Sequence, residues 1–166
     1  MSKMKPTIKY GLISGALAGS WMFIQFMTGV YKTPFGSIAG SLFYILLLFC
    51  IFVGIRETRD KLFNGIIDIK SAVSNGLQVA AVSAVIHALI TYLYWVWVPA
   101  DFYVYLVDTV KQVGAELKKS PEDIAQQLEQ LQENLKPFRQ ATLTVFNSMI
   151  PGIFGSIIFA FILKKP

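Results

Sequence analysis

The sequence has few charged residues and few of the residue types from which catalytic or metal sites are built. Asp, Glu, Lys and Arg make up 15% of its 166 residues, against roughly 25% in an average soluble domain. Cys50 is the single cysteine and His87 the single histidine, which excludes an intrachain disulfide and a multi-cysteine zinc site. The sequence contains no P-loop, dinucleotide-binding fingerprint, HExxH or CxxC. We therefore expect no catalytic residue, no cofactor and no metal.

Charge is absent from four long stretches, residues 10–31, 33–55, 71–100 and 140–163, which are 22, 23, 30 and 24 residues long. A helix of about 20 apolar residues crosses the ~30 Å hydrocarbon layer of a membrane. A chain of this length lacks the polar surface to cover four such helices in water. We predict an all-α polytopic membrane protein, one domain over residues 1–166, with spans at about 10–31, 34–55, 72–98 and 141–163.

Basic residues predict the orientation of these spans. If the N-terminus is cytoplasmic, the inner segments hold nine Lys and Arg residues and the outer segments hold six. Cytoplasmic loops collect Lys and Arg, so we expect both termini on the cytoplasmic side. The aromatic residues near the proposed outer ends agree, because amphipathic rings favour the headgroup region; they are Tyr31, Phe35, Tyr94, Trp95 and Trp97.

Small residues recur along three of the spans. In the first span Gly11, Gly15 and Gly19 follow one another at intervals of four, which places them on one helix face. Such a face lets a second helix approach closely in lipid. The second and fourth spans carry similar residues, namely Gly36, Gly40, Gly152 and Gly155. These seven glycines are predicted helix-packing positions, either within the bundle or at a dimer interface.

Polar residues inside the third span also share a face, since Ser83, His87 and Thr91 are spaced by four. Gln25 of the first span lies at a similar depth. Polar groups in lipid turn inward and pair, so these four are predicted intramembrane polar contacts. His87 is either a proton or ligand site or one partner of an interhelical hydrogen bond. No acid lies in any predicted span, which disfavours a pump or an ion-coupled transporter.

The segment from about residue 99 to 140 is predicted to be an extracytoplasmic hairpin of two amphipathic helices. Apolar residues follow helical spacing in both halves. In the second half, Ser120 is placed to cap the helix, Pro121 suits its first position and Asp123 completes a capping box. The hairpin is predicted either to dock a partner or to act as a lid over the ends of the spans.

The stretch IRETRDKLFNGIIDIKSA, residues 55–72, gathers four basic and three acidic residues between the second and third spans. We interpret it as a cytoplasmic turn, with Asn64-Gly65 adopting positive φ. Arg56, Arg59 and Lys61 are predicted to contact anionic lipid headgroups. Its apolar residues are expected to lie in the membrane interface; they are Leu62, Phe63, Ile66, Ile67 and Ile69.

The order of these segments resembles a known family. It runs from KYGL through IRETRDKLFNGIIDIKSAVSNGL, PADF and SPEDI to GSIIFAFILKK. This is similar to the bacterial membrane-protein family called domain of unknown function 4199, over about residues 9–165. Two departures from the family pattern are visible. Asn64-Gly65 and Ile69 stand where the family commonly has a Gly-Gly turn and a nearby aromatic residue, and Ala100 separates Pro99 from Asp101. The resemblance implies a four-span protein of a bacterial inner membrane, and it implies no activity.

Function is therefore predicted in general terms. We expect a non-catalytic accessory or assembly subunit that binds other membrane proteins, or itself, within the lipid bilayer. A small channel or carrier acting as an oligomer is the alternative, with the Ser83-His87-Thr91 stripe as its pore. A lipid-active enzyme ranks third, because only Arg56, Arg59 and Asp60 lie near the headgroups. The basic residues flank the spans, so no nucleic-acid partner is expected.

Overall fold

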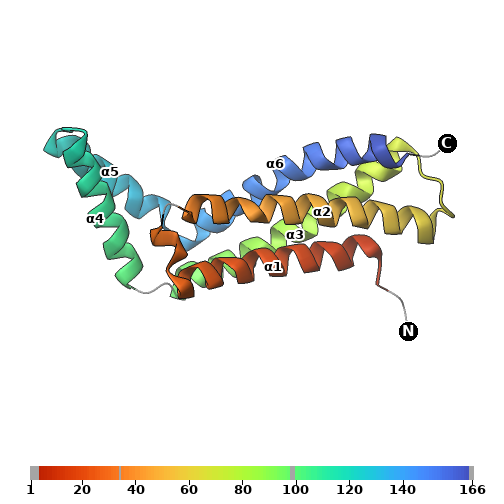
Figure 1. Ribbon diagram of the computed structural model, residues 1–166, viewed down its shortest axis with the longest axis horizontal. Coiled ribbons are helices and arrows are strands. Elements are labelled where there is room, and N and C mark those ends of the chain that lie inside the picture. Colours follow the sequence, from red (N-terminus) through yellow and green to blue (C-terminus); the bar gives the residue numbers. More distant parts are fainter. Residues whose placement is uncertain (1–3, 34, 98–99, 165–166) are drawn as a thin grey trace.

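The protein is a bundle of long helices with a helical hairpin at one end (Figure 1). The computed structural model describes residues 4–33, 35–97 and 100–164. The elements are α1 (Pro6–Thr28), the short 3-10 helix η1 (Val30–Lys32), α2 (Gly36–Leu62), α3 (Ile69–Trp97), α4 (Ala100–Glu116), α5 (Pro121–Asn134) and α6 (Pro137–Leu163). The long helices α1, α2, α3 and α6 lie lengthwise beside one another.

Four helices of the described chain, α1, α2, α3 and α6, are long and apolar enough to cross a membrane. This confirms the predicted all-α, four-span architecture. The second span was predicted to end at residue 55, but α2 continues to Leu62. Arg, Glu and Lys are good helix formers, and Lys61 pairs with Glu57 one turn away, so the helix does not stop where the apolar residues stop. The predicted end of the third span, residue 98, lies outside the described residues.

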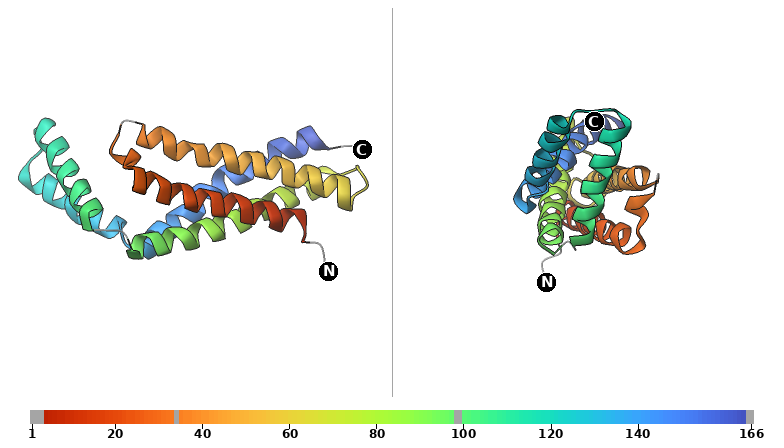
Figure 2. Two further views of the ribbon diagram at one scale, coloured as in Figure 1. Left: turned by 60° about the horizontal axis from the view of Figure 1, so that its bottom comes forward. Right: turned by 90° about the vertical axis from the view of Figure 1, so that its left-hand side faces the viewer.

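The bundle has two different ends (Figures 1 and 2). One holds the two chain ends and the turn between α2 and α3, and we call it the termini end. The other holds η1 and the α4–α5 hairpin, and we call it the hairpin end. At the termini end, Asn64 and Gly65 have φ of 53° and 85°, which confirms the predicted turn. Ile67 was predicted to lie in the membrane interface, but it is buried because the turn folds back over the core.

Many large apolar side chains cover the outside of the bundle, and several small polar ones lie inside it beside core residues such as Leu47 and Ile51. Ser83, Ser148 and Ser156 are fully buried, whereas Phe49 and Phe154 are exposed. Water would favour the opposite arrangement. In lipid an exposed Phe costs nothing, and small interior residues let helices approach closely. The distribution of side chains therefore supports the membrane assignment independently of helix length.

The hairpin is built as the sequence predicts. Ser120 Oγ accepts a hydrogen bond from the Asp123 backbone N–H at 3.1 Å and donates to the Asp123 carboxylate at 2.9 Å. At the end of α4, Lys118 adopts φ of 51°, and the next backbone N–H donates back to the Gly114 carbonyl, as in a Schellman motif. The hairpin runs across the end of the bundle and leaves α2 visible beside it (Figure 2, right).

Candidate functional site

The most extensive helix contact joins α3 to α6 through small residues. A Cβ added to Gly152 would lie 2.5 Å from the Ala80 Cβ, and one added to Gly76 would lie 2.7 Å from the Ser156 Cβ. Ala72, Ala80 and Ala84 are almost fully buried. We call this run of small residues on both helices the α3–α6 ladder. It brings the two backbones close together, which is how helices without a hydrophobic drive hold to each other in lipid.

The glycine face of α1 also packs inside the bundle, against α3. Added Cβ atoms on Gly11, Gly15 and Gly19 would collide with Val82, Ile86 and Ile90, one after another. Each branched side chain of α3 therefore fills the space that one glycine leaves. The glycines of α1 hold α1 to α3 within the chain.

The two glycines of α2 lie differently. A Cβ on Gly40 would meet no described atom within 4 Å, and Gly36 contacts the backbone of the η1 turn rather than another span. Neither residue makes a close contact of this kind with another transmembrane helix within the described chain, so their role in packing the bundle stays a prediction. Their role at a dimer interface also stays a prediction. Gly155, by contrast, packs against Leu48 of α2.

The polar face of α3 divides among three neighbouring helices. Ser83 Oγ donates to Ser14 Oγ of α1 at 3.1 Å, where both residues are fully buried. The Thr144 hydroxyl of α6 lies 3.4 Å from that of Thr91. Between these two levels, the His87 ring packs on Phe43 of α2 with centroids 4.6 Å apart. Ser83 and Thr91 thus make interhelical contacts, and His87 makes a different kind of contact.

A small cavity of about 200 Å³ adjoins His87 in the hairpin half of the bundle. We call it the polar chamber, and its polar lining consists of Gln25, Tyr44, His87, Thr144 and Asn147, with Trp21 and Phe43 beside them. His87 Nδ1 is buried and has no hydrogen-bond partner among the described residues. The structure therefore brings Gln25 and His87 to one chamber, as their similar depth suggested, without a hydrogen bond between them.

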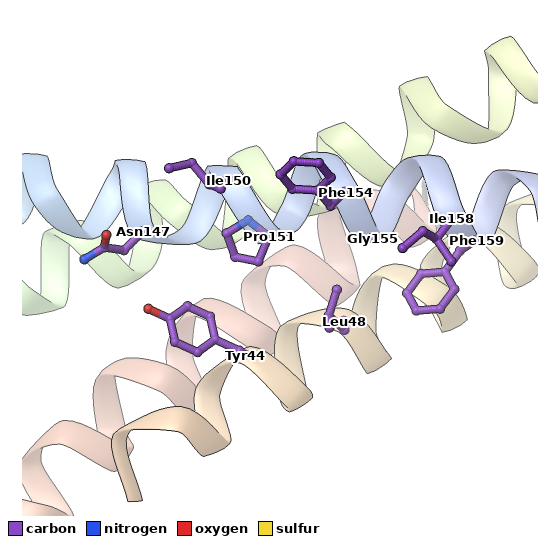
Figure 3. A pocket seen from close by; sticks show the side chains of 9 residues that line it. All are labelled: Tyr44, Leu48, Asn147, Ile150, Pro151, Phe154, Gly155, Ile158 and Phe159. Carbon is purple, nitrogen blue, oxygen red and sulfur yellow. The ribbon is translucent and has the colours of Figure 1, made fainter. Parts of the chain in front are cut away.

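The chamber adjoins a longer apolar depression on the outside of the bundle (Figure 3). We call it the α2–α6 groove; its volume is about 680 Å³, and its lining includes Tyr44, Leu48, Asn147, Pro151, Phe154 and Ile158. Tyr44 and Asn147 line both spaces. They lie together at one end of the groove, with the apolar residues beyond them.

At the termini end, the charged residues pair with one another. The Glu57 carboxylate accepts from the Tyr10 hydroxyl at 2.5 Å and from Lys61 at 2.6 Å, and Lys9 lies 3.4 Å away. Arg59 bonds Asp60 at 2.7 Å, and its guanidinium lies 3.4 Å from the Leu163 carbonyl. These contacts join α1, α2 and α6 at one level.

The three predicted headgroup residues are thus not equivalent. The side chains of Arg56 and Lys61 are 61% and 65% exposed, so they remain predicted headgroup contacts. The side chain of Arg59 is only 12% exposed and is held at the end of α6. A headgroup role for Arg59 does not fit this position, because its guanidinium is engaged inside the protein.

Aromatic side chains join the hairpin to the bundle. Phe102 of α4 packs edge-on against Tyr31, with centroids 4.9 Å apart, and contacts Phe26 and Trp95 as well. Tyr31 also meets Tyr105. The predicted belt residues Tyr31 and Trp95 therefore belong to a packed cluster that fixes the base of the hairpin.

A family model described as a protein of unknown function (DUF4199) matches residues 9–165. The chain belongs to this family. Searches of curated proteins and of solved structures find no match. The DUF4199 assignment confirms the resemblance and carries no activity with it, so function must be argued from the site itself. Among the described residues of this DUF4199 chain, no group of three or more His, Cys, Asp or Glu is placed to hold a metal.

We did not predict two features of the DUF4199 chain from its sequence. Ala72, Gly76, Ala80, Ala84 and Ala88 recur every four residues in α3, a signal as regular as the glycines of α1, and they form half of the α3–α6 ladder. The second feature is a missing helical hydrogen bond between Pro151 and Asn147. Proline has no N–H, so Pro151 cannot donate to the Asn147 carbonyl four residues before it.

Proposed function

We propose that this protein is a non-catalytic membrane subunit that binds a second membrane-associated protein through its α4–α5 hairpin. The observation that carries the proposal is the exposure of α5. No residue of α5 is buried, although the helix is well capped and fully formed. The apolar residues Ile124, Leu128 and Leu131 are half-buried, with Ile124 packed on Gly114 of α4, so the remaining faces of α5 are the surface left for a partner.

The charge on α5 favours a protein over the membrane surface as that partner. The helix carries Glu122, Asp123, Glu129 and Glu133 and no Lys or Arg. Helices that lie on anionic lipid carry Lys and Arg on their polar face, so α5 has the wrong sign for that role. On α4, Val104, Val113 and Leu117 are exposed as well. An acidic helix beside exposed apolar residues suits a partner with a basic, partly apolar face.

The remaining small-residue surface is limited. The glycines of α1 and the small residues of α6 pack against α3 and α2, so they are not free to bind other proteins. Gly40 of α2 has open space beside it and also lines the polar chamber; its role in self-association stays a prediction. The hairpin is therefore the larger of the two surfaces on which the proposal rests.

We place the protein in a bacterial inner membrane, with the termini end in the cytoplasm and the hairpin outside. The distribution of Lys and Arg supports this orientation. Of the nine inner basic residues, Lys3 and Lys165 lie outside the described residues; the others flank the termini end. A channel or carrier ranks second. The polar chamber favours it, but Leu47, Ile51 and Ile55 are fully buried in the termini half of the bundle, where they occupy the space that a polar path would need.

Site-specific photo-cross-linking of the full-length protein in its native membrane tests the proposal. A benzophenone amino acid at Gln126 of α5 should capture one discrete protein that also co-purifies in fixed stoichiometry. The charge reversal Glu129→Lys should reduce that capture, while Lys70→Glu, a change of equal size at the termini end, should leave it unchanged. Capture of no protein from Gln126, or equal capture in both variants, would remove the hairpin from the proposal.

A further inference from the structure

The polar chamber contains more hydrogen-bonding capacity than the described residues use. His87 Nδ1 is buried without a partner, and the side-chain amides of Gln25 and Asn147 make no hydrogen bond within the described chain. The Asn147 carbonyl also receives no N–H from Pro151. Unpaired polar groups inside a membrane are costly. Elsewhere on the same helix face, Ser83 donates to Ser14. Two hydroxyls outside the chamber, those of Thr58 and Ser148, are also buried without a partner among the described residues, but only the chamber gathers several such groups around a cavity.

The chamber and the groove together have the form of a site for an amphiphile. The chamber is small and polar, and the α2–α6 groove beside it is larger and almost wholly apolar. Tyr44 and Asn147 form the boundary between them, and Figure 3 places both at one end of the groove. A molecule with a compact polar head and a long apolar tail would satisfy both spaces at once.

The lining also indicates the charge of that head. No Asp, Glu, Lys or Arg is present among the described residues that line either space. A phosphate would have no cation to pair with there, and an amine would have no carboxylate. The groups available are amide, hydroxyl and imidazole, which bond to uncharged carbonyl and hydroxyl oxygens.

We propose that the polar chamber and the α2–α6 groove bind an uncharged lipid, with its oxygen-bearing head beside His87 and Asn147 and its tail along Phe154 and Ile158. Isoprenoid quinones and diacylglycerols share this chemistry. A phospholipid does not, because its headgroup is charged. The proposal is independent of the hairpin partner, since the two surfaces lie on different parts of the molecule.

Two variants separate binding from folding. Asn147→Leu replaces an amide that bonds to no described side chain with an apolar side chain, so the bundle should fold normally while the head loses one contact. Ile158→Trp places a large ring where the tail would lie. Its matched control is Ile157→Trp, because Ile157 is exposed on the same helix but does not line the groove.

The measurement is native mass spectrometry of the delipidated full-length protein with menaquinone-4, dioleoylglycerol or phosphatidylglycerol as the added probe. We expect one neutral lipid to bind in a 1:1 ratio, more tightly than phosphatidylglycerol. Affinity should fall about tenfold in Asn147→Leu, as for one lost hydrogen bond. It should also fall in Ile158→Trp and remain unchanged in Ile157→Trp.

Each outcome decides the proposal. Preference for menaquinone-4 or for dioleoylglycerol supports it and shows which class of neutral lipid the site binds. Equal binding of phosphatidylglycerol, no binding of either neutral lipid, or affinity unaltered by both site variants overturns it. A lipid-free dimer that Ile158→Trp abolishes and Ile157→Trp preserves also overturns it, because a second copy of the chain would then cover the groove.

Discussion

The hydroxyls of Ser14 and Ser83 lie 3.1 Å apart in the fully buried interior and join α1 to α3. One turn further along α3, His87 Nδ1 is also buried but has no partner among the described residues. Of these two polar groups on one face of α3, the Ser83 hydroxyl thus has a hydrogen-bond partner in the bundle and His87 Nδ1 has none among the described residues. We interpret the first as part of the structure and the second as part of a binding site.

The Ser14–Ser83 hydrogen bond should stabilise the bundle by a small, measurable amount. Interhelical hydrogen bonds in membrane proteins average about 0.6 kcal/mol, with a maximum near 1.7 kcal/mol. A double-mutant cycle with Ser14→Ala and Ser83→Ala, followed by equilibrium unfolding in mixed micelles, should give a coupling energy in this range. Additive effects of the two single variants would mean that the hydroxyls do not interact in the membrane.

The α3–α6 ladder should be intolerant of added volume. Gly152→Ala places a methyl group 2.5 Å from the Ala80 Cβ, so the helices must separate, and overpacking of this kind typically costs about 1–3 kcal/mol. The control is Gly40→Ala, where no described atom lies within 4 Å and removal of a helical glycine stabilises by up to about 1 kcal/mol. Thermal unfolding in detergent should separate the two variants. Equal stability of both would contradict the close approach of α3 and α6.

Asp68 should make the stability of the protein depend on pH in the acidic range. Its carboxylate caps α3, accepting from the Ser71 backbone N–H at 2.9 Å and from the Ser71 hydroxyl at 2.7 Å. These hydrogen bonds hold the pKa of Asp68 below its usual value of 3.8. Because the folded-state pKa is the lower one, the stabilisation is present at neutral pH and is lost as the pH falls through that pKa.

For Asp68 we expect a difference in unfolding temperature between variant and unmodified protein that becomes smaller as the pH falls. Asp68→Ala should lower the unfolding temperature at about pH 7, and its gap to the unmodified protein should shrink towards about pH 2. Asp68→Asn, which keeps a capping oxygen and does not titrate, serves as the control and should show little change of its gap across the same range. If acid closes neither gap, Asp68 does not stabilise α3 through its charge.

Local signals in the sequence predict the helices but not how they associate. Charge-free length predicts the four spans, and the Asn64-Gly65 and Ser120-Pro121 pairs predict a turn and a cap because those preferences are set by backbone geometry at the residues themselves. The partner of each small-residue face could not be predicted, since a glycine face fits many helices equally well. Gly15 packs on α3, whereas a Cβ on Gly40 would meet no described atom within 4 Å.

The candidate site could be predicted only in part, because it too depends on how the helices associate. The positions of Gln25 and His87 could be anticipated from their depth in the spans. The contribution of Tyr44 and Asn147 could not, because it depends on the side-by-side placement of α2 and α6. The burial of Arg59 depends on the end of α6, more than a hundred residues further along the chain.

The separation of the two ends by a membrane underlies every proposal made here, and cysteine labelling tests it directly. In a Cys50→Ala background, single cysteines are introduced by Gln126→Cys at the hairpin end and Lys70→Cys at the termini end. A membrane-impermeant maleimide applied to intact spheroplasts should label the first and spare the second, and permeabilisation should expose both. Labelling of the second alone would invert the topology, and labelling of both in intact spheroplasts would contradict the four-span arrangement.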